Sequence, residues 1–172
     1  MSSSTKHWYV AVTYRKERLI KRELDKIKVE NFIPFRKVVK ERKGKKVKVP
    51  ELVIPGYVFL YTDTKTSLEL TSQPGLSMRY LKEPNTYKPV IIPDKQMHDF
   101  ITLLNLPEDQ AQLVPCDLKK GDPVRITQGT FAGIEGELVR LHGHKRVLVR
   151  LNNIAAVATA FIPAAFLERI EK

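Results

Sequence analysis

The first region of the chain is organised around one apolar stretch, PGYVFLY at residues 55–61. Its Pro-Gly pair predicts a turn, and the five residues that follow form an apolar run without polar alternation. Such a run is typical of a strand that is covered on both faces, so we expect a central strand at 57–61. A second strand is expected at 6–13 (KHWYVAVT), which is rich in β-branched and aromatic residues.

Periodicity and turn signals predict the other elements of this region. Ile20, Leu24 and Ile27 recur at helical spacing, which predicts a helix over 15–28. The remaining expected elements are a strand at 31–39, a hairpin tip at 42–46 with a returning strand at 47–53, a helix at 64–72, a strand at 78–81 and a helix at 94–105. This mixture of strands, hairpins and helices indicates an α+β domain over residues 1–106.

The pattern of expected secondary structure changes after this domain. Residues 107–117 (PEDQAQLVPCD) contain two prolines and three acids without periodicity, which predicts a linker. Over 118–172 we expect only short strands, at 123–127, 134–141, 146–151, 154–161 and 166–170. Five short strands in about 50 residues favour a small β barrel. Because these strands are rich in β-branched residues, we expect the barrel to remain β-structured rather than refold into helices.

Positive charge is concentrated near the N-terminus. The 172 residues carry 30 Lys and Arg against 19 Asp and Glu, a net charge of +11. Residues 1–50 hold 16 basic and 5 acidic side chains, whereas residues 51–172 hold 14 of each. The densest stretch, 36–48, has eight basic residues and one acid. A charged run can be a solvated loop, but a field this concentrated favours a surface that binds a polyanion such as nucleic acid.

Motifs of common enzymes are absent from the sequence, including the phosphate-binding loop, the nucleophile elbow and the zinc-protease helix. His142 and His144 flank Gly143 in a predicted turn without cysteine or carboxylate ligands nearby, so we expect no metal site. Cys116 lies beside Asp117, where a thiol is not activated. The sequence therefore gives no positive evidence for an enzyme, and we expect none, with no cofactor and no bound metal.

Features that would direct the chain to a membrane or out of the cell are also missing. No apolar run reaches the roughly 18 residues of a transmembrane helix. The segment MSSSTK at residues 1–6 lacks the apolar stretch of a signal peptide, and a single cysteine excludes an internal disulfide. These features predict a cytoplasmic protein with no membrane partner.

Aromatic residues recur in both expected central strands. Trp8 and Tyr9 lie in the first strand, and Tyr57 and Phe59 in the second. These side chains could form a core. Tryptophan and tyrosine are also enriched where a protein meets a partner, because their apolar rings carry polar tips.

Two motifs in this order resemble the NusG family of transcription elongation factors. The first combines WYV at 8–10 with PGYVF at 55–59. The second, KGDPVRIT at 120–127 followed by GTFAGIEG at 129–136, resembles the KOW motif that ends those proteins. The KOW positions are Gly121, Asp122, Val124, Gly129, Phe131, Gly133 and Gly136. The resemblance implies an N-terminal NusG-type domain, with an antiparallel sheet and flanking helices, linked to an SH3-like β barrel.

Within the family, the chain resembles specialised paralogues of bacteria. The stretches VENFIPF at 29–35, LKKGDPVRIT at 118–127 and AAVATAF at 155–161 are similar to UpxY-type antiterminators of polysaccharide operons, and more distantly to RfaH. This resemblance implies a factor that suppresses pausing or premature termination in specific operons.

The resemblance also implies partners and site residues. Family members dock an apolar depression on the β′ clamp helices of RNA polymerase and bridge toward the β lobe. The matching positions that would form or support the depression are Trp8, Tyr9, Ile54, Pro55, Gly56, Tyr57 and Phe59, with Thr66 and Ser67 toward the lobe. The positions that would face the non-template DNA strand are Arg15, Lys16, Lys21 and Arg22. The KOW barrel would bind a second partner, such as a ribosomal protein or a termination factor.

An alternative from another class is a ribosome-associated RNA-binding protein that uses a KOW barrel. That function places the basic surplus on the barrel, yet all of the net charge lies in the first 50 residues. It also leaves the aromatic residues around the Pro-Gly turn without a role. The sequence therefore favours the transcription factor.

Overall fold

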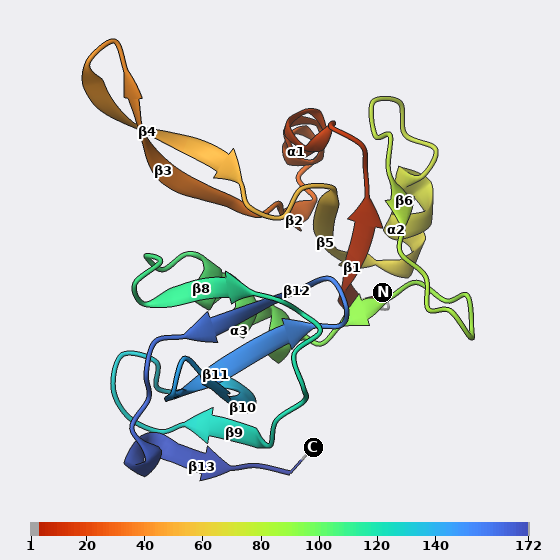
Figure 1. Ribbon diagram of the computed structural model, residues 1–172. Helices are drawn as coiled ribbons and strands as arrows, with labels where there is room; N and C mark the ends of the chain where they lie inside the picture. The colour runs from red at the N-terminus through yellow and green to blue at the C-terminus, as the bar shows by residue number, and fades with distance from the viewer. Residues whose placement is uncertain (1–3, 172) are drawn as a thin grey trace. The chain divides into compact units, whose positions relative to one another are not determined.

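The computed structural model describes residues 4–171 and contains two compact units (Figure 1). The first ends at Pro93 and the second begins at Asp94, and each has a sheet of its own. This division precedes the boundary that we expected at residue 106. The terminal residues of the two predicted domains, 1–3 and 172, lie outside the described residues.

The first unit is built on two long antiparallel strands, β1 (Lys6–Val12) and β5 (Tyr57–Asp63). Strand β2 (Glu30–Phe32) pairs with the other edge of β5, while β6 (Arg79–Tyr80) and β7 (Ile91–Ile92) pair with β1. Strand β5 therefore has a partner on each side, which confirms the central strand that its apolar run predicted.

Two helices contribute to the core on one face of this sheet. Helix α1 (Glu17–Lys26) buries Ile20 and Leu24 against Val58 of the sheet, and α2 (Thr64–Leu70) adds Leu70 to the same cluster. Helix α1 is shorter than the predicted 15–28 because Arg15 and Lys28 adopt left-handed backbone angles, with φ of 54° and 58°. Such residues cannot continue a right-handed helix.

A basic hairpin forms a two-stranded ribbon of its own (orange in Figure 1). It consists of β3 (Phe35–Arg42) and β4 (Lys45–Leu52), joined by a tight turn in which Lys43 and Gly44 both have positive φ. We predicted one strand over 31–39, but the chain breaks at Ile33–Pro34 into β2 and β3. The proline has no N–H to donate to a ladder, so pairing stops there.

The second unit is a curled six-stranded antiparallel sheet, the small barrel that the short strands predicted. The hydrogen-bonded order is β13-β9-β10-β11-β12-β8. The strands are β8 (Ala111–Val114), β9 (Pro123–Ile126), β10 (Glu135–Leu141), β11 (His144–Leu151), β12 (Ala155–Thr159) and β13 (Leu167–Arg169), and a short 3₁₀ helix spans Ala164–Phe166. The five strands expected in this region are confirmed.

One strand of this sheet was not predicted. Strand β8 lies within 107–117, where we expected a linker without regular structure, and it pairs along its length with β12. The composition of β8 gives no strand signal. The strand forms because its backbone groups are paired with a partner strand about 45 residues away in sequence. The segment is therefore part of the sheet over those residues.

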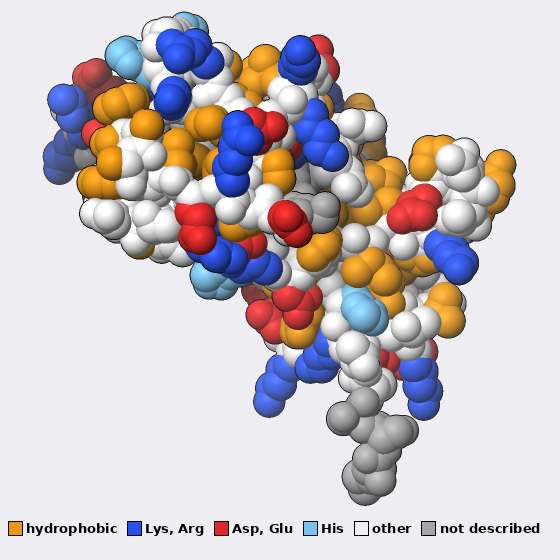
Figure 2. All heavy atoms as spheres, turned by 90° about the horizontal axis from the view of Figure 1, so that it is seen from below, with side chains coloured by type: hydrophobic (Ala, Val, Ile, Leu, Met, Phe, Trp, Pro, Cys, Tyr) orange, Lys and Arg blue, Asp and Glu red, His pale blue; other side chains and the backbone are white. Residues whose placement is uncertain are grey.

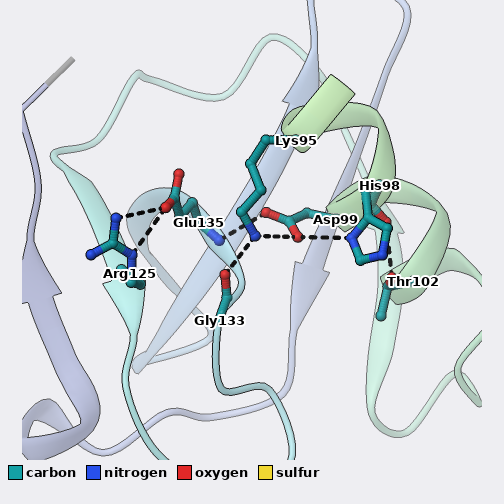
Figure 3. A network of polar contacts seen from close by, with 7 residues as sticks. All are labelled: Lys95, His98, Asp99, Thr102, Arg125, Gly133 and Glu135. Atoms are coloured by element: carbon teal, nitrogen blue, oxygen red, sulfur yellow. Dashed lines mark hydrogen bonds and ion pairs between the residues drawn. The ribbon is translucent and has the colours of Figure 1, made fainter. Parts of the chain in front are cut away.

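Helix α3 (Asp94–Leu104) belongs to the second unit, although we expected it in the first domain. Figure 3 shows how a buried carboxylate fixes it there. Asp99 is 1% exposed and accepts hydrogen bonds from the Glu135 backbone N–H (3.1 Å) and from Lys95 Nζ (2.8 Å). Lys95 also donates to the Gly133 carbonyl at 2.7 Å. A buried charge requires such partners, so these contacts hold α3 against the turn that precedes β10.

Replacing Gly136 by alanine should destabilise the second unit by about 2–3 kcal/mol, because the added methyl overpacks a closed interior. A Cβ at this position would lie 2.4 Å from the Leu148 carbonyl oxygen and 2.9 Å from a Val147 methyl. Chemical unfolding of the two variants measures the effect. The control is Gly143→Ala, where no atom lies within 4 Å and only the positive φ of 80° opposes the substitution, at a cost of about 1 kcal/mol. Equal losses at both positions would contradict the steric explanation.

Within residues 4–171, no helix is both long and apolar enough to cross a membrane. The same described residues contain no cluster of three or more His, Cys, Asp or Glu side chains that could hold a metal ion.

Candidate functional site

The turn that precedes β5 is held from two sides. Gly56 has φ of 90°, which a residue with a side chain rarely adopts. Its N–H donates to Glu17 Oε1 at 2.8 Å, and its carbonyl accepts from the Thr13 N–H at 2.9 Å. Glu17 is 5% exposed at the start of α1, so it serves as an internal support for the turn. The turn fixes the position of Tyr57, the next residue.

The predicted aromatic depression is divided between the two faces of the sheet. In the β1–β5 register Trp8 pairs with Tyr61 and Tyr9 with Leu60, so Trp8 and Tyr9 point to opposite sides. The Trp8 and Tyr61 rings lie 5.2 Å apart on the face that also carries Phe59. Trp8 and Tyr9 can therefore form or support a depression only from opposite faces of the sheet.

Tyr9 lies on the helix-covered face with a fixed hydroxyl. It is 3% exposed, and its hydroxyl is 3.1 Å from Thr64 Oγ1. The Tyr80 ring lies 5.8 Å from the Tyr9 ring, and burial together with Tyr9 raises the pKa of Tyr80 to about 12. The Tyr80 phenol is therefore neutral at physiological pH.

Accessibility separates the candidate polymerase-binding residues into two groups. Trp8, Tyr9, Ile54, Phe59 and Ser67 are buried, whereas Gly56, Tyr57 and Thr66 are half-buried and Pro55 is exposed. The buried residues can only support a surface. Contact with a partner falls to the accessible group, in which Tyr57 offers the largest side chain.

Thr66 and Ser67 lie in the first turn of α2, and their polar groups are used within it. The Asp63 side chain caps the helix by accepting from the Thr66 backbone N–H (2.8 Å) and hydroxyl (3.0 Å). These hydrogen bonds hold the pKa of Asp63 below its usual value. Ser67 donates to the Thr64 carbonyl at 2.7 Å. This arrangement is a helix N-terminus with its own cap.

The four predicted DNA-facing residues do not share one helical face. Arg15 precedes α1 and lies 5.2 Å from the centroid of the Tyr14 ring, and Lys16 is the N-cap position. Lys21 and Arg22 lie on α1 itself. We predicted all four on the helix, so the placement of Arg15 and Lys16 is corrected to the segment before it.

The basic hairpin presents the densest positive charge, and we did not include its residues among the predicted sites. Its exposed basic side chains are Lys37, Lys40, Arg42, Lys43, Lys45, Lys46 and Lys48, and Arg36 is half-buried. Lys40 Nζ pairs with Glu51 at 3.3 Å. By contrast, Figure 2 shows a face of the molecule on which basic, acidic and hydrophobic side chains are interspersed. The run at 36–48 was the sequence signal for this surface.

The predicted KOW positions surround β9 and the turn to β10. Val124 is buried in β9, and Gly136 is buried in β10. Asp122 pairs with Arg169 at 3.2 Å. The other positions are Gly121 before β9, and Gly129, Phe131 and Gly133 in the turn between the strands. The KOW positions therefore lie in strands β9 and β10, in the turn that joins them and in the residues just before β9.

Comparison with known proteins assigns the family. The profile described as "Transcription termination factor nusG" matches residues 6–101, more than half of the chain. The chain belongs to the NusG family. The match covers β1, the Pro-Gly turn, the basic hairpin and both helices of the first unit, so every candidate surface of that unit lies within the family domain.

Two curated relatives and one solved structure resemble the chain over half of its length or more. A Streptococcus pyogenes serotype M1 protein named "Transcription termination/antitermination protein NusG" is 25% identical over 173 residues, covering 93% of this chain and 94% of that protein. A Deinococcus radiodurans protein of the same name is 28% identical over 105 residues, covering 54% and 55%. A solved structure described as "Domain interaction in Thermotoga maritima NusG" has 20% identity and a TM-score of 0.48, and covers 97% of this chain and 98% of that one.

Proposed function

We propose that this protein is a transcription elongation and antitermination factor that binds RNA polymerase and suppresses pausing or premature termination. The observation that carries the proposal is the family match across the first unit, residues 6–101. The proteins that resemble it over most of their length are named as transcription termination/antitermination proteins. Such a factor acts by binding, and needs an apolar anchor and a positive face rather than catalytic groups.

The proposed anchor for polymerase is the turn at Pro55–Gly56 together with Tyr57. Hydrogen bonds to Glu17 and Thr13 support this turn, so little conformational entropy is lost when it docks. A half-buried tyrosine offers both apolar area and a hydroxyl, a combination common among interface residues that dominate affinity. Its proposed target is the clamp-helix region of the β′ subunit, with α2 toward the β lobe.

The proposed contact with nucleic acid is the basic hairpin together with the positive charges at the start of α1. Phosphate groups attract such a field through release of counterions. We propose that these residues face the non-template strand of the elongation complex. The second unit would bind a further partner, such as a ribosomal protein or termination factor, and the targets would be specific operons such as those for polysaccharide synthesis.

The ribosome-associated alternative has less support from the charge distribution. The dense basic surface lies on the first unit, whereas that alternative needs it on the barrel. The family match also covers the first unit, and the alternative assigns no function to that unit.

Replacing Tyr57 by alanine should weaken binding to core RNA polymerase by about 1–3 kcal/mol, the usual effect of truncating an interface aromatic. Tyr57 is half-buried at the first position of β5, so the loss of contact area should exceed the loss of internal packing. Titration of fluorescently labelled full-length protein with core polymerase, in the absence of nucleic acid, measures the change.

The matched control for this titration is Tyr87→Ala. Tyr87 is 76% exposed in another loop of the first unit, and its removal should leave affinity unchanged. Thermal unfolding of both variants checks that the fold survives. Wild-type affinity in a folded Tyr57→Ala variant would refute the assigned anchor.

A further inference from the structure

Each strand of the basic hairpin has an outer edge, and the two edges differ. The tight turn closes on the pair Arg42 and Lys45, and at the other end of the ribbon the Val53 N–H donates to the Pro34 carbonyl at 3.0 Å. In an antiparallel ladder, hydrogen-bonded and non-hydrogen-bonded pairs alternate. The even-numbered residues of β3 therefore direct their backbone groups toward β4, and the odd-numbered residues direct theirs outward.

The outer edge of β4 is closed. Pro50 lies on this edge without an N–H to donate, and its carbonyl accepts from Arg18 Nη2 at 3.1 Å. The Arg18 guanidinium is itself held over the Phe35 ring, 4.9 Å from the centroid. A proline and a side chain that occupies the backbone both prevent an edge from pairing with a further strand.

The outer edge of β3 is open. Among residues 4–171, β3 pairs only with β4, and the ribbon extends away from the sheet of the first unit (Figure 1). Lys37, Val39 and Glu41 each direct a backbone N–H and a carbonyl outward, at the spacing of an antiparallel ladder. None of these positions is a proline, and Val39 is 60% exposed. A strand of another chain can therefore continue the ribbon as a third strand.

Charge selects the strand that can pair with this edge. Side chains alternate along β3, so Arg36, Lys40 and Arg42 lie on one face of the ribbon. Lys40 Nζ is 3.3 Å from one carboxylate, that of Glu51. The stretch 36–48 nevertheless carries eight basic residues and one acid. An incoming strand is therefore stabilised by glutamate or aspartate at alternate positions beside these cations, and by apolar residues beside the exposed valine of the edge.

We propose that the outer edge of β3 binds an acidic, extended segment of a partner protein as an added strand. The backbone of that segment pairs with Lys37, Val39 and Glu41. A second copy of this chain fits poorly, because its own hairpin repeats the same positive charge. Nucleic acid also fits poorly, since phosphate oxygens accept hydrogen bonds and cannot donate to the outward carbonyls. The inference goes beyond the proposed function: a bound acidic strand would lower the positive field that the hairpin offers to phosphate.

The test uses a labelled seven-residue peptide that alternates glutamate and valine, with glutamate at both ends. Fluorescence anisotropy measures its affinity for the full-length protein. The proposed pairing sets the three valines opposite Lys37, Val39 and Glu41, so the valine N–H groups point at β3 and the glutamate N–H groups point away. Methylation of the valine nitrogens should weaken binding at least about 10-fold, as expected for loss of three hydrogen bonds. Methylation of the glutamate nitrogens keeps these bonds and should change affinity less than about 2-fold.

Two variants of one residue test the same edge from the protein side. Val39→Pro removes an outward N–H that takes no part in the ladder with β4, and it should weaken binding of the unmodified peptide at least about 5-fold. Val39→Thr is the matched control. It keeps the N–H and the β-branched shape, so affinity should change less than about 2-fold.

Amide hydrogen exchange in the wild-type protein gives a second measurement, which does not depend on the folding of the proline variant. The unmodified peptide should slow exchange at Lys37, Val39 and Glu41. It should leave exchange unchanged at Lys46 and Lys48, which lie on the closed edge of β4.

Four outcomes would overturn the proposal. The first two are no binding of the peptide and equal losses for its two methylated forms, the latter being expected of charge attraction alone. The others are slower exchange at the β3 edge when the protein alone is concentrated, which would assign the edge to a second copy, and slower exchange there with oligo-dT, which would assign it to nucleic acid. None of these measurements contains polymerase, so failure of this site and failure of the proposed function are distinguishable.

Discussion

Reversal of charge at the tip of the basic hairpin should weaken binding to an RNA polymerase elongation complex by at least about 100-fold at low salt, because several phosphate contacts are lost together. The four substitutions are Lys40, Arg42, Lys45 and Lys46 to glutamate. All four side chains are exposed on a ribbon that pairs with no other strand, so the fold of the first unit should tolerate the change. Affinity for core polymerase without nucleic acid should remain nearly unchanged.

Salt dependence separates this mechanism from a general loss of structure. Each phosphate contact contributes about 0.9 to the slope of log affinity against log salt, so removing three or four contacts should reduce the slope by about 3. The control carries the same charge change elsewhere on the first unit, at the exposed residues Lys65, Arg79, Lys82 and Lys88. A loss that is equal for free and nucleic-acid-bound polymerase, or the same at every salt concentration, would refute the assigned role of the hairpin.

Replacing Arg150 by alanine should lower the free energy of unfolding of the second unit by about 3–5 kcal/mol, the usual cost of leaving a buried ion pair with one partner. Arg150 Nε donates to Glu137 Oε2 at 2.9 Å, and both side chains are largely buried. The same guanidinium donates to the carbonyls of Leu118, at 2.9 Å, and Cys116. It therefore ties the segment between β8 and β9 to the sheet. Urea unfolding measures the loss, and Arg140→Ala, at an exposed position of β10, should change stability by less than about 0.5 kcal/mol.

The same ion pair predicts a dependence on pH. Desolvation raises the pKa of Glu137, but hydrogen bonds from Arg150 and from the Gly121 N–H outweigh it, so the pKa lies below its ordinary value of 4.5. A carboxyl with a depressed pKa contributes stability that is fully present above its ordinary value and is lost as pH falls through the depressed one. Unfolding free energies of wild type and Glu137→Gln should therefore differ most near pH 7 and converge below pH 4.5. A difference that stays constant across this range would contradict the assignment.

Local patterns in the sequence were sufficient to predict most of the elements. The apolar run at 57–61 and the spacing of Ile20 and Leu24 report burial directly, so the central strand and α1 were found with errors only at the ends. Strand β8 and the placement of α3 were missed because they depend on partners far away in sequence. The pairing of β8 with β12, and the contacts of the buried Asp99, are choices of the tertiary fold.

The candidate polymerase-binding residues remain a prediction, but part of their arrangement can be derived from the sequence. Trp8 and Tyr9 lie on opposite faces of the sheet, which follows from the period of two along a strand. The burial of Phe59 follows from the apolar run at 57–61, whereas the support of the turn by Glu17 depends on packing that periodicity does not describe. The density of charge at 36–48 identified the basic surface, but the contact of Arg18 with Phe35 joins a helix to a hairpin and has no local signal.

The central claim is that this protein binds the elongation complex and thereby shortens pauses. The most direct measurement is the lifetime of RNA polymerase at a defined pause site, in a purified transcription assay with saturating full-length protein. We expect shorter pauses with the wild type, and Tyr57→Ala should need a concentration about 5- to 100-fold higher to shorten pauses equally, in line with its weaker binding. Pause lifetimes that stay unchanged while the wild-type protein is bound to the elongation complex would contradict the account.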